Sequence, residues 1–235
     1  MGVLAKIKKD LKKKSNREKA AVLQRFFKTG PGEYAEGDVF LGIKMPDTRQ
    51  IAGKYSDVPL DDIKKLLKAR VHEERMTALL IMVSKFKKGN EKERKELYRV
   101  YLDNTENINN WDLVDATAEH VVGAYLEDKE KKPLYRLVGS SSMWERRISV
   151  LSTFRYIKKH SFDDALRISE ILIDDKEDLI HKAVGWMLRE IGKRDIKKEK
   201  AFLERKYKNM PRTMLRYAIE KFPEKERQAY LKGKV

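Results

Sequence analysis

The sequence Asn109-Asn110-Trp111-Asp112-Leu113-Val114-Asp115 begins one of the long helices that the apolar pattern of the chain predicts. Its dipeptide Trp111-Asp112 has counterparts in three other predicted long helices, at Arg75-Met76, Arg147-Ile148 and Trp186-Met187. Successive counterparts lie 36, 36 and 39 residues apart, which is the length of one helical hairpin. Such hairpins stack, because none of them buries its apolar face alone. The repeat therefore predicts an all-α fold, a curved solenoid of HEAT-like helical hairpin repeats.

Nearly all of the chain is predicted to be helical, and no segment alternates with the period of two that is typical of a strand. The glycine-rich stretch Thr29–Asp38 is predicted to be a loop. The predicted helices are Val3–Lys14, a second one from the capping box Ser15–Glu18 through Phe27, then Asp47–Tyr55, Leu60–Ala69, Glu73–Lys87, Glu91–Leu102, Trp111–Leu126, Lys132–Val138, Trp144–Lys158, Phe162–Ile173, Glu177–Ile191, Lys197–Tyr207 and Arg212–Phe222. We expect a single repeat domain over residues 1–235, with basic N-terminal helices in 1–28 and the repeat core in about 40–222. A pair of three-helix bundles is the alternative.

Charge indicates the kind of partner. The 235 residues include 53 lysines and arginines and 37 acids, a formal net charge of +16. This surplus favours nucleic acid, or less often an anionic membrane, as the partner. A salt-adapted or thermophilic protein with charged helix faces would have a similar composition, and the lysine-rich first helix fits either a solvated face or nonspecific DNA contact.

Several functions are not expected. There are no cysteines, and the four histidines lack the spacing of a metal site, so we expect no catalytic metal and no cofactor. No signal peptide or apolar run of membrane-spanning length is found. We therefore expect a cytoplasmic protein that is nucleoid-associated when it is on DNA.

Trp111 and Asp115 are four residues apart, so a helix presents both on one face. An aromatic face beside a carboxylate suits a cationic ligand. If the hairpins stack, Arg147 and Trp186, one and two hairpins later, are expected to line the same groove.

Four segments resemble the motifs of one family, the AlkD-like DNA glycosylases of DNA alkylation repair, which are built from HEAT-like repeats. They are Phe40–Arg49, Trp111–Asp115, Trp144–Arg147 and Lys182–Glu190, and the resemblance runs from about Phe26 to Phe222 in the order and spacing of the family. It implies excision of cationic N3- and N7-alkylated purines, such as 3-methyladenine and 7-methylguanine, from duplex DNA.

The resemblance also implies roles for single residues. Trp111, Asp115 and Trp186 match the aromatic and acidic active-site positions of the family. The residues expected at the DNA are Arg147, which matches an arginine beside that site, Arg49 and Arg189, which match positions facing the backbone, and the neighbouring Arg146 and Lys182. The sequence departs from the family at Asn110, where a second tryptophan is frequent, and at Phe26, where tyrosine is frequent.

The chemistry of the residues agrees with this resemblance. Alkylation at N3 or N7 makes a purine a better leaving group, and a carboxylate such as Asp115 suits both stabilisation of an oxocarbenium-like sugar and activation of water. No lysine is singled out as a Schiff-base nucleophile, which favours a monofunctional glycosylase, expected to be a monomer. A noncatalytic HEAT-repeat protein that binds damaged or branched DNA and a HEAT-type protein scaffold are the alternatives.

Overall fold

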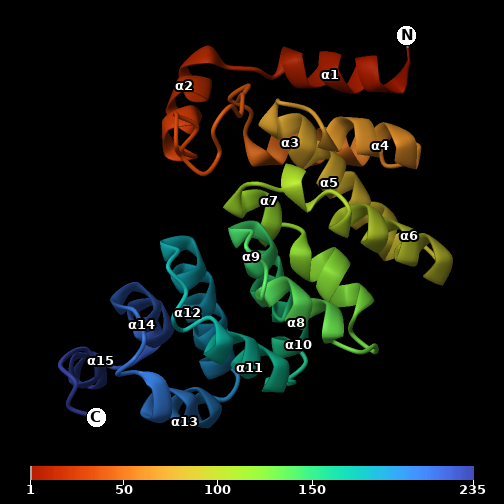
Figure 1. Cartoon of the computed structure of the whole chain (residues 1–235). Helices are drawn as coiled ribbons and strands as arrows, with labels where there is room; N and C mark the ends of the chain where they lie inside the picture. Colours follow the sequence, from red (N-terminus) through yellow and green to blue (C-terminus); the bar gives the residue numbers. More distant parts are fainter. Residues whose placement is uncertain (1) are drawn as a thin grey trace. The chain divides into compact units, whose positions relative to one another are not determined.

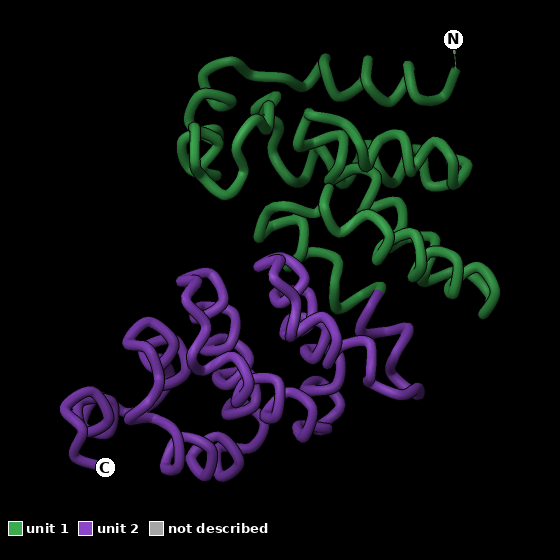
Figure 2. The backbone as a smooth tube through the Cα atoms, viewed as in Figure 1, with its two compact units in different colours: residues 1–121 green, residues 122–235 purple. Residues whose placement is uncertain are grey.

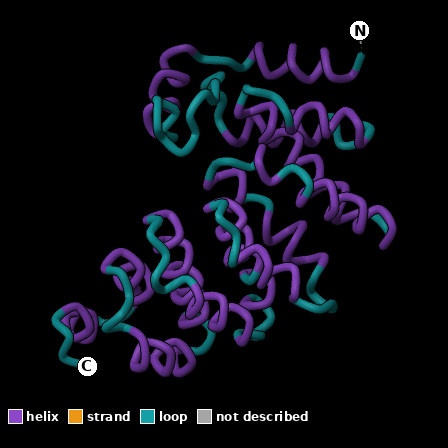
Figure 3. Tube along the Cα trace, in the orientation of Figure 1, coloured by secondary structure: helices purple, strands orange, loops and turns teal. Residues whose placement is uncertain are grey.

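The computed structural model describes residues 2–235, which are mostly helical (Figures 1 and 3). Apart from an isolated bridge between Val39 and Val71, these residues form no strand, and the predicted all-α fold is confirmed. The chain divides into two compact units, residues 1–121 and 122–235 (Figure 2), described separately below. None of the helices in the described part is long and apolar enough to cross a membrane. A single curved repeat domain stays a prediction.

Unit 1 is built around α5 (His72–Lys88), a 17-residue helix that is buried over most of its length. It packs against α3 (Met45–Lys54), α4 (Leu60–Leu67) and α6 (Glu91–Leu102). The remaining elements of the unit are α1 (Val3–Lys13), α2 (Arg17–Phe26), the 3-10 helix η1 (Thr105–Asn107) and α7 (Trp111–Asp115). The π-helix η2 (Glu119–Gly123) includes Val121 and Val122, between which the chain divides into its two units.

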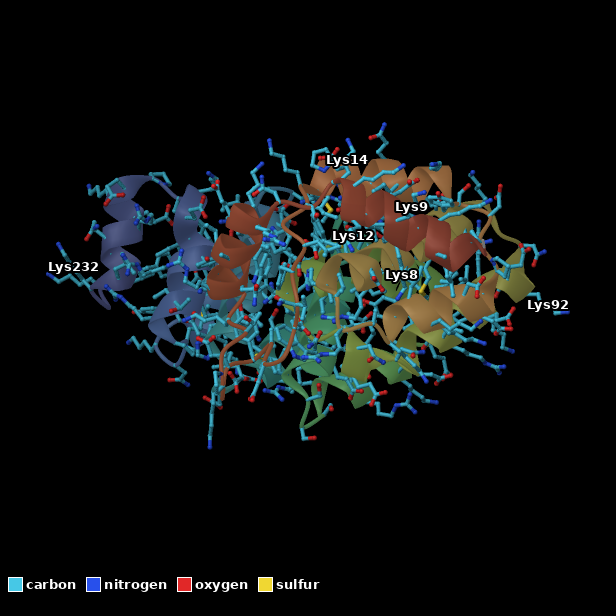
Figure 4. All side chains as sticks on the ribbon, turned by 90° about the horizontal axis from the view of Figure 1, so that it is seen from above. Lys8, Lys9, Lys12, Lys14, Lys92 and Lys232 are labelled. Carbon is cyan, nitrogen blue, oxygen red and sulfur yellow. The ribbon has the colours of Figure 1, made fainter. Side chains whose placement is uncertain are left out.

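α1 is amphipathic, as the sequence predicts. Its apolar side buries Ile7 and Leu11. Figure 4 labels three of its lysines, Lys8, Lys9 and Lys12, and the C-cap residue Lys14. Lys8 pairs with Glu74 of α5 at 2.8 Å. Lys8 is exposed and Glu74 is buried in this pair, so α1 is anchored both by the burial of its two apolar residues and by this ion pair.

The predicted cap of the second helix is wrong. Asn16, not Ser15, is the N-cap of α2, and its side chain accepts a hydrogen bond from the backbone N–H of Lys19 at 2.9 Å. The Ser15 hydroxyl instead donates to the carbonyl of Lys12 at 2.7 Å and so ends α1. Serine and asparagine both cap helices well, but here the serine side chain is already hydrogen-bonded to the end of the preceding helix.

The single predicted helix Trp111–Leu126 is also wrong, because α7 ends at Asp115 and η2 follows it. The Thr117 hydroxyl donates to the carbonyl of Leu113 at 2.5 Å and lies 2.9 Å from the Tyr101 hydroxyl. A threonine that bonds to the carbonyl four residues back disturbs a helix. The break thus depends on a buried contact with α6.

Unit 2 is built around α12 (Asp178–Gly192), which packs against α9 (Met143–Ser152), α13 (Ile196–Lys206) and α14 (Arg212–Ala218). Its other elements are α8 (Lys132–Val138), α10 (Phe154–Ile157), α11 (Asp163–Ile171), η3 (Ile219–Lys221) and α15 (Glu224–Leu231). The predicted helix Trp144–Lys158 is divided into α9 and α10 at Thr153, whose hydroxyl donates to the carbonyl of Val150 at 2.6 Å. The final helix, α15, was not predicted.

Candidate functional site

The indole of Trp111, the first residue of α7, is half-buried in a cluster of aromatic rings. Phe27 stacks on it with centroids 5.1 Å apart and an interplanar angle of 23°, and Phe26 meets it edge-on at 6.0 Å. Phe40 and His72 lie 4.9 and 5.4 Å from the Phe27 ring and extend the stack. Each such pair contributes about 0.5–1.5 kcal/mol beyond burial. The cluster therefore fixes the orientation of the indole.

A cavity of 810 Å³ lies beside this cluster within unit 1. Its walls come from α2, residues 27, 40, 42–46 and 48, α5 and α7, and they include Trp111, Phe27 and Phe40. Most of the remaining wall is apolar, for example Leu23 and Met76, while charged groups contribute a smaller part. The size and lining are typical of a small-molecule site.

Asp112 joins this cavity to a buried charged network. Its Oδ2 lies 2.8 Å from Nε2 of His72, and Nδ1 of His72 lies 3.7 Å from Oδ2 of Asp38. Burial alone would lower the pKa of His72, but the hydrogen-bonded Asp112 and the nearby carboxylate of Asp38 outweigh it and raise the pKa above its usual value. Burial likewise opposes ionisation of Asp38, but His72 and Arg75 outweigh it and lower its pKa. The imidazolium form is thus favoured.

Asp115 is the last residue of α7 and is half-buried. Burial, followed by the nearby charge of Asp115, raises the pKa of the Tyr101 hydroxyl. Trp111 and Asp115 therefore stand at the two ends of one helix of 5 residues. Of the two acids in α7, Asp112 is among the residues found to line the cavity, and Asp115 is not.

Glu73 holds the loop that follows the glycine-rich segment. Its Oε1 accepts hydrogen bonds from the backbone N–H groups of Leu41, Gly42 and Ile43 at 2.9–3.2 Å, and its Oε2 also accepts from Leu41 at 2.9 Å. Gly42 has φ of +78°, and a Cβ there would lie 2.2 Å from the carbonyl oxygen of Asn16. Only glycine fits both constraints.

Sequence reasoning missed Glu73 and His72. A signal was present, because residues 72–75 are four consecutive ionisable residues at the start of a helix with a long apolar run, residues 78–83. Charged groups that enter a core are paired or hydrogen-bonded. Their partners, however, lie 30–40 residues away in the sequence.

Trp186 lies in α12 and is half-buried. Its Nε1 donates to Oε1 of Glu190 at 3.3 Å, and the Phe154 ring is tilted against it at 5.8 Å. Burial would raise the pKa of Glu190, but Lys193 and Arg194 outweigh burial and lower it. Glu190 is therefore an anion that orients the indole.

Arg146 and Arg147 of α9 both have partners within unit 2. Arg146 donates from Nε and Nη2 to the carboxylate of Asp175 at 2.6 and 3.2 Å, and from Nη1 to two backbone carbonyls. Arg147 is 4% exposed and donates to the carbonyl of Leu179. In this structure both arginines therefore connect parts of unit 2, and their role at DNA stays a prediction.

The other predicted DNA-contacting residues differ in availability. Arg49 is exposed on α3. Lys182 pairs with Asp178 at 2.8 Å, and Arg189 pairs with Glu220 of η3. Trp186, Lys182 and the arginines of α9 and α12 belong to unit 2, whereas Trp111, Asp115 and Arg49 belong to unit 1.

The fold and these side chains define an all-α protein with a basic sequence and, in each unit, a tryptophan held by other side chains. No group of three or more histidines and acids within residues 2–235 is placed to hold a metal ion. The chain belongs to the family of DNA alkylation repair enzymes, whose model matches residues 7–222. Its role is therefore in DNA alkylation repair, and DNA is its partner.

Solved structures share the fold. A predicted DNA alkylation repair enzyme from Enterococcus faecalis is 16% identical, with a TM-score of 0.69 over 90% of this chain and 98% of its own. AlkD2 from Streptococcus mutans is 20% identical, with a TM-score of 0.56 over 88% of this chain and 99% of its own. No curated protein matches the sequence.

Proposed function

We propose that the protein is a monofunctional DNA glycosylase that hydrolyses the N-glycosidic bond of N3- and N7-alkylated purines, such as 3-methyladenine and 7-methylguanine, in duplex DNA. Asp115, Trp111 and Trp186 are the proposed catalytic residues. The observation that carries the proposal is the pairing of Trp111 and Asp115 at the two ends of α7, with the indole held against Phe27. A helical spacing of four presents both to one ligand.

The proposed chemistry needs little beyond charge and water. The cationic purine is already a good leaving group, and the sugar becomes positively charged as the bond breaks. Asp115 stabilises this charge and accepts a proton from the attacking water. The faces of Trp111 and Trp186 attract a cationic nucleotide by about 0.5–2 kcal/mol each. A neutral base gains less, which gives selectivity for the lesion.

DNA contact is proposed first for Arg49, because its guanidinium lies on an exposed helix. DNA contact is proposed also for four residues that already have a protein partner, each of which exchanges that partner for a phosphate when DNA binds: Arg146, Arg147, Arg189 and Lys182. All proposed residues come from one chain, so a monomer suffices.

The test is release of 7-methylguanine from methylated duplex DNA under single-turnover conditions, followed by chromatography. Asp115→Asn is expected to lower the excision rate by about a hundredfold to a thousandfold while retaining affinity for the duplex. The matched control is Asp61→Asn, an exposed acid of α4 that pairs with Lys64. Excision by Asp115→Asn at the wild-type rate would remove Asp115 from the mechanism.

The same assay separates the alternative function. If wild-type protein binds damaged duplex but releases no base, the noncatalytic DNA-binding reading is correct and the glycosylase is excluded.

A further inference from the structure

The start of α5 carries a buried network of charged side chains that the proposed chemistry does not use. His72 lies between Asp112 of α7 and Asp38 of the preceding loop. Arg75 donates from Nη2 to Asp38 at 2.5 Å and to Asn109 Oδ1 at 2.9 Å, and Asn109 donates back to Asp38 at 3.3 Å. The network therefore connects α5, the loop and the residues that begin α7.

The two ring nitrogens of His72 face carboxylates at different distances: Nε2 lies 2.8 Å from Oδ2 of Asp112, within hydrogen-bond range, and Nδ1 lies 3.7 Å from Oδ2 of Asp38, beyond it. A protonated imidazole carries an N–H on both nitrogens and so suits a carboxylate on each side. The other charged groups around the ring are Arg75, which opposes its charge, Glu73, whose oxygens accept from backbone N–H groups, and, along the same cavity, Glu18, Lys19 and Lys44. The two carboxylates are the nearest, and they outweigh burial in raising the pKa of the ring.

α7 needs external support because it has only 5 residues. A helix this short does not persist by itself. Asp112 supplies one connection, since one oxygen accepts from the N–H of Leu113 at 2.9 Å and the other lies 2.8 Å from His72. Phe27 supplies a second, because its ring lies between those of His72 and Trp111, at 5.4 and 5.1 Å.

We propose that His72, as an imidazolium, is a positioning residue that holds α7 through Asp112 and so sets the orientation of Trp111 and Asp115. The effect on excision rests on the proposed glycosylase function; the effect on α7 does not. The sign of the pH dependence follows from the raised pKa of His72. The charge-assisted hold on α7 is complete below the ordinary histidine pKa of about 6.5 and is lost as pH rises through the higher pKa of the folded protein, above which a neutral imidazole keeps at most an uncharged N–H contact with Asp112.

The first experiment uses the full chain without DNA. The protein has 3 tryptophans, so 5-fluorotryptophan labelling gives three ¹⁹F resonances, and Trp111→Phe assigns one of them. The Trp111 resonance is expected to move with pH, with a midpoint above about 6.5. His72→Gln, which keeps a hydrogen-bond donor but no charge, is expected to abolish this transition. The exposed His160, changed to Asn, is the control and should leave it intact.

The second experiment measures single-turnover excision against pH. His72→Gln is expected to lower the rate by about tenfold to a hundredfold at pH 6, because small misplacements of a catalytic group have effects of this size. It should also flatten the loss of activity on the alkaline side. If His72→Gln does not fold, Asp112→Asn removes the same ion pair from the other side and is expected to give the same two results.

The outcomes separate the two proposals. A Trp111 transition that persists in His72→Gln, or in Asp112→Asn, overturns the positioning role. A transition that disappears in the variants, in a protein whose wild type releases no base, supports the positioning role and overturns the glycosylase.

Discussion

Glu73 is a buried carboxylate that accepts backbone N–H groups of three consecutive loop residues, 41–43. Glu73→Gln replaces one acceptor oxygen by a donor, which leaves buried N–H groups without a partner. We expect it to lower the free energy of unfolding by about 2–4 kcal/mol. Urea denaturation followed by circular dichroism measures the change.

The control for Glu73 is Glu96→Gln, an exposed acid of α6, which should change stability by less than about 0.5 kcal/mol. Equal midpoints for the two variants would mean that Glu73 does not hold the loop.

At the scale of elements, α12 and α14 approach each other closely at Gly185. A Cβ there would lie 2.4 Å from the carbonyl oxygen of Met214 and 2.5 Å from Cβ of Tyr217. Both are backbone or near-backbone atoms, so relief requires a helix shift. We expect Gly185→Ala to destabilise the protein by about 1–3 kcal/mol, measured by thermal unfolding.

Gly53→Ala is a matched control because Gly53 lies within α3 and a Cβ there would meet no atom within 4 Å. Alanine has the higher helix propensity, so this variant should gain up to about 1 kcal/mol. A gain at Gly185 as well would contradict the close approach.

The helices also show which features a sequence can predict. Apolar periodicity is local, so the long helices α5, α6 and α12 were located to within a few residues. The end of α7 depends on Thr117 meeting Tyr101, 16 residues earlier in the chain, and periodicity contains no information on that contact. The N-cap of the second helix was predicted wrongly because both Ser15 and Asn16 fit the capping pattern.

At the scale of the whole molecule, the same difference between local patterns and distant contacts decides which candidate site residues a sequence can predict. Trp111, Asp115 and Trp186 were proposed from the sequence because each lies in a short continuous motif. His72, Asp38 and Glu73 were not, because their roles come from partners about 30–40 residues away. The positive charge was evident from composition, but composition does not distinguish an exposed arginine such as Arg49 from one committed to the fold.

The formal charge of +16 predicts strong salt dependence of DNA binding, and the structure predicts which cations contribute. Binding releases about 0.9 counterions per neutralised phosphate. Arg49→Ala is therefore expected to weaken binding to undamaged duplex and to reduce the slope of log K against log salt by about 1. Arg146→Ala is expected to reduce the slope by less than Arg49→Ala does and also to lower the unfolding midpoint, because in the free protein its donors are bonded to Asp175 and two carbonyls. Fluorescence anisotropy at several salt concentrations measures both slopes. A slope unchanged by Arg146→Ala, in protein shown to be folded, would mean that Arg146 keeps Asp175 on binding and serves the fold alone.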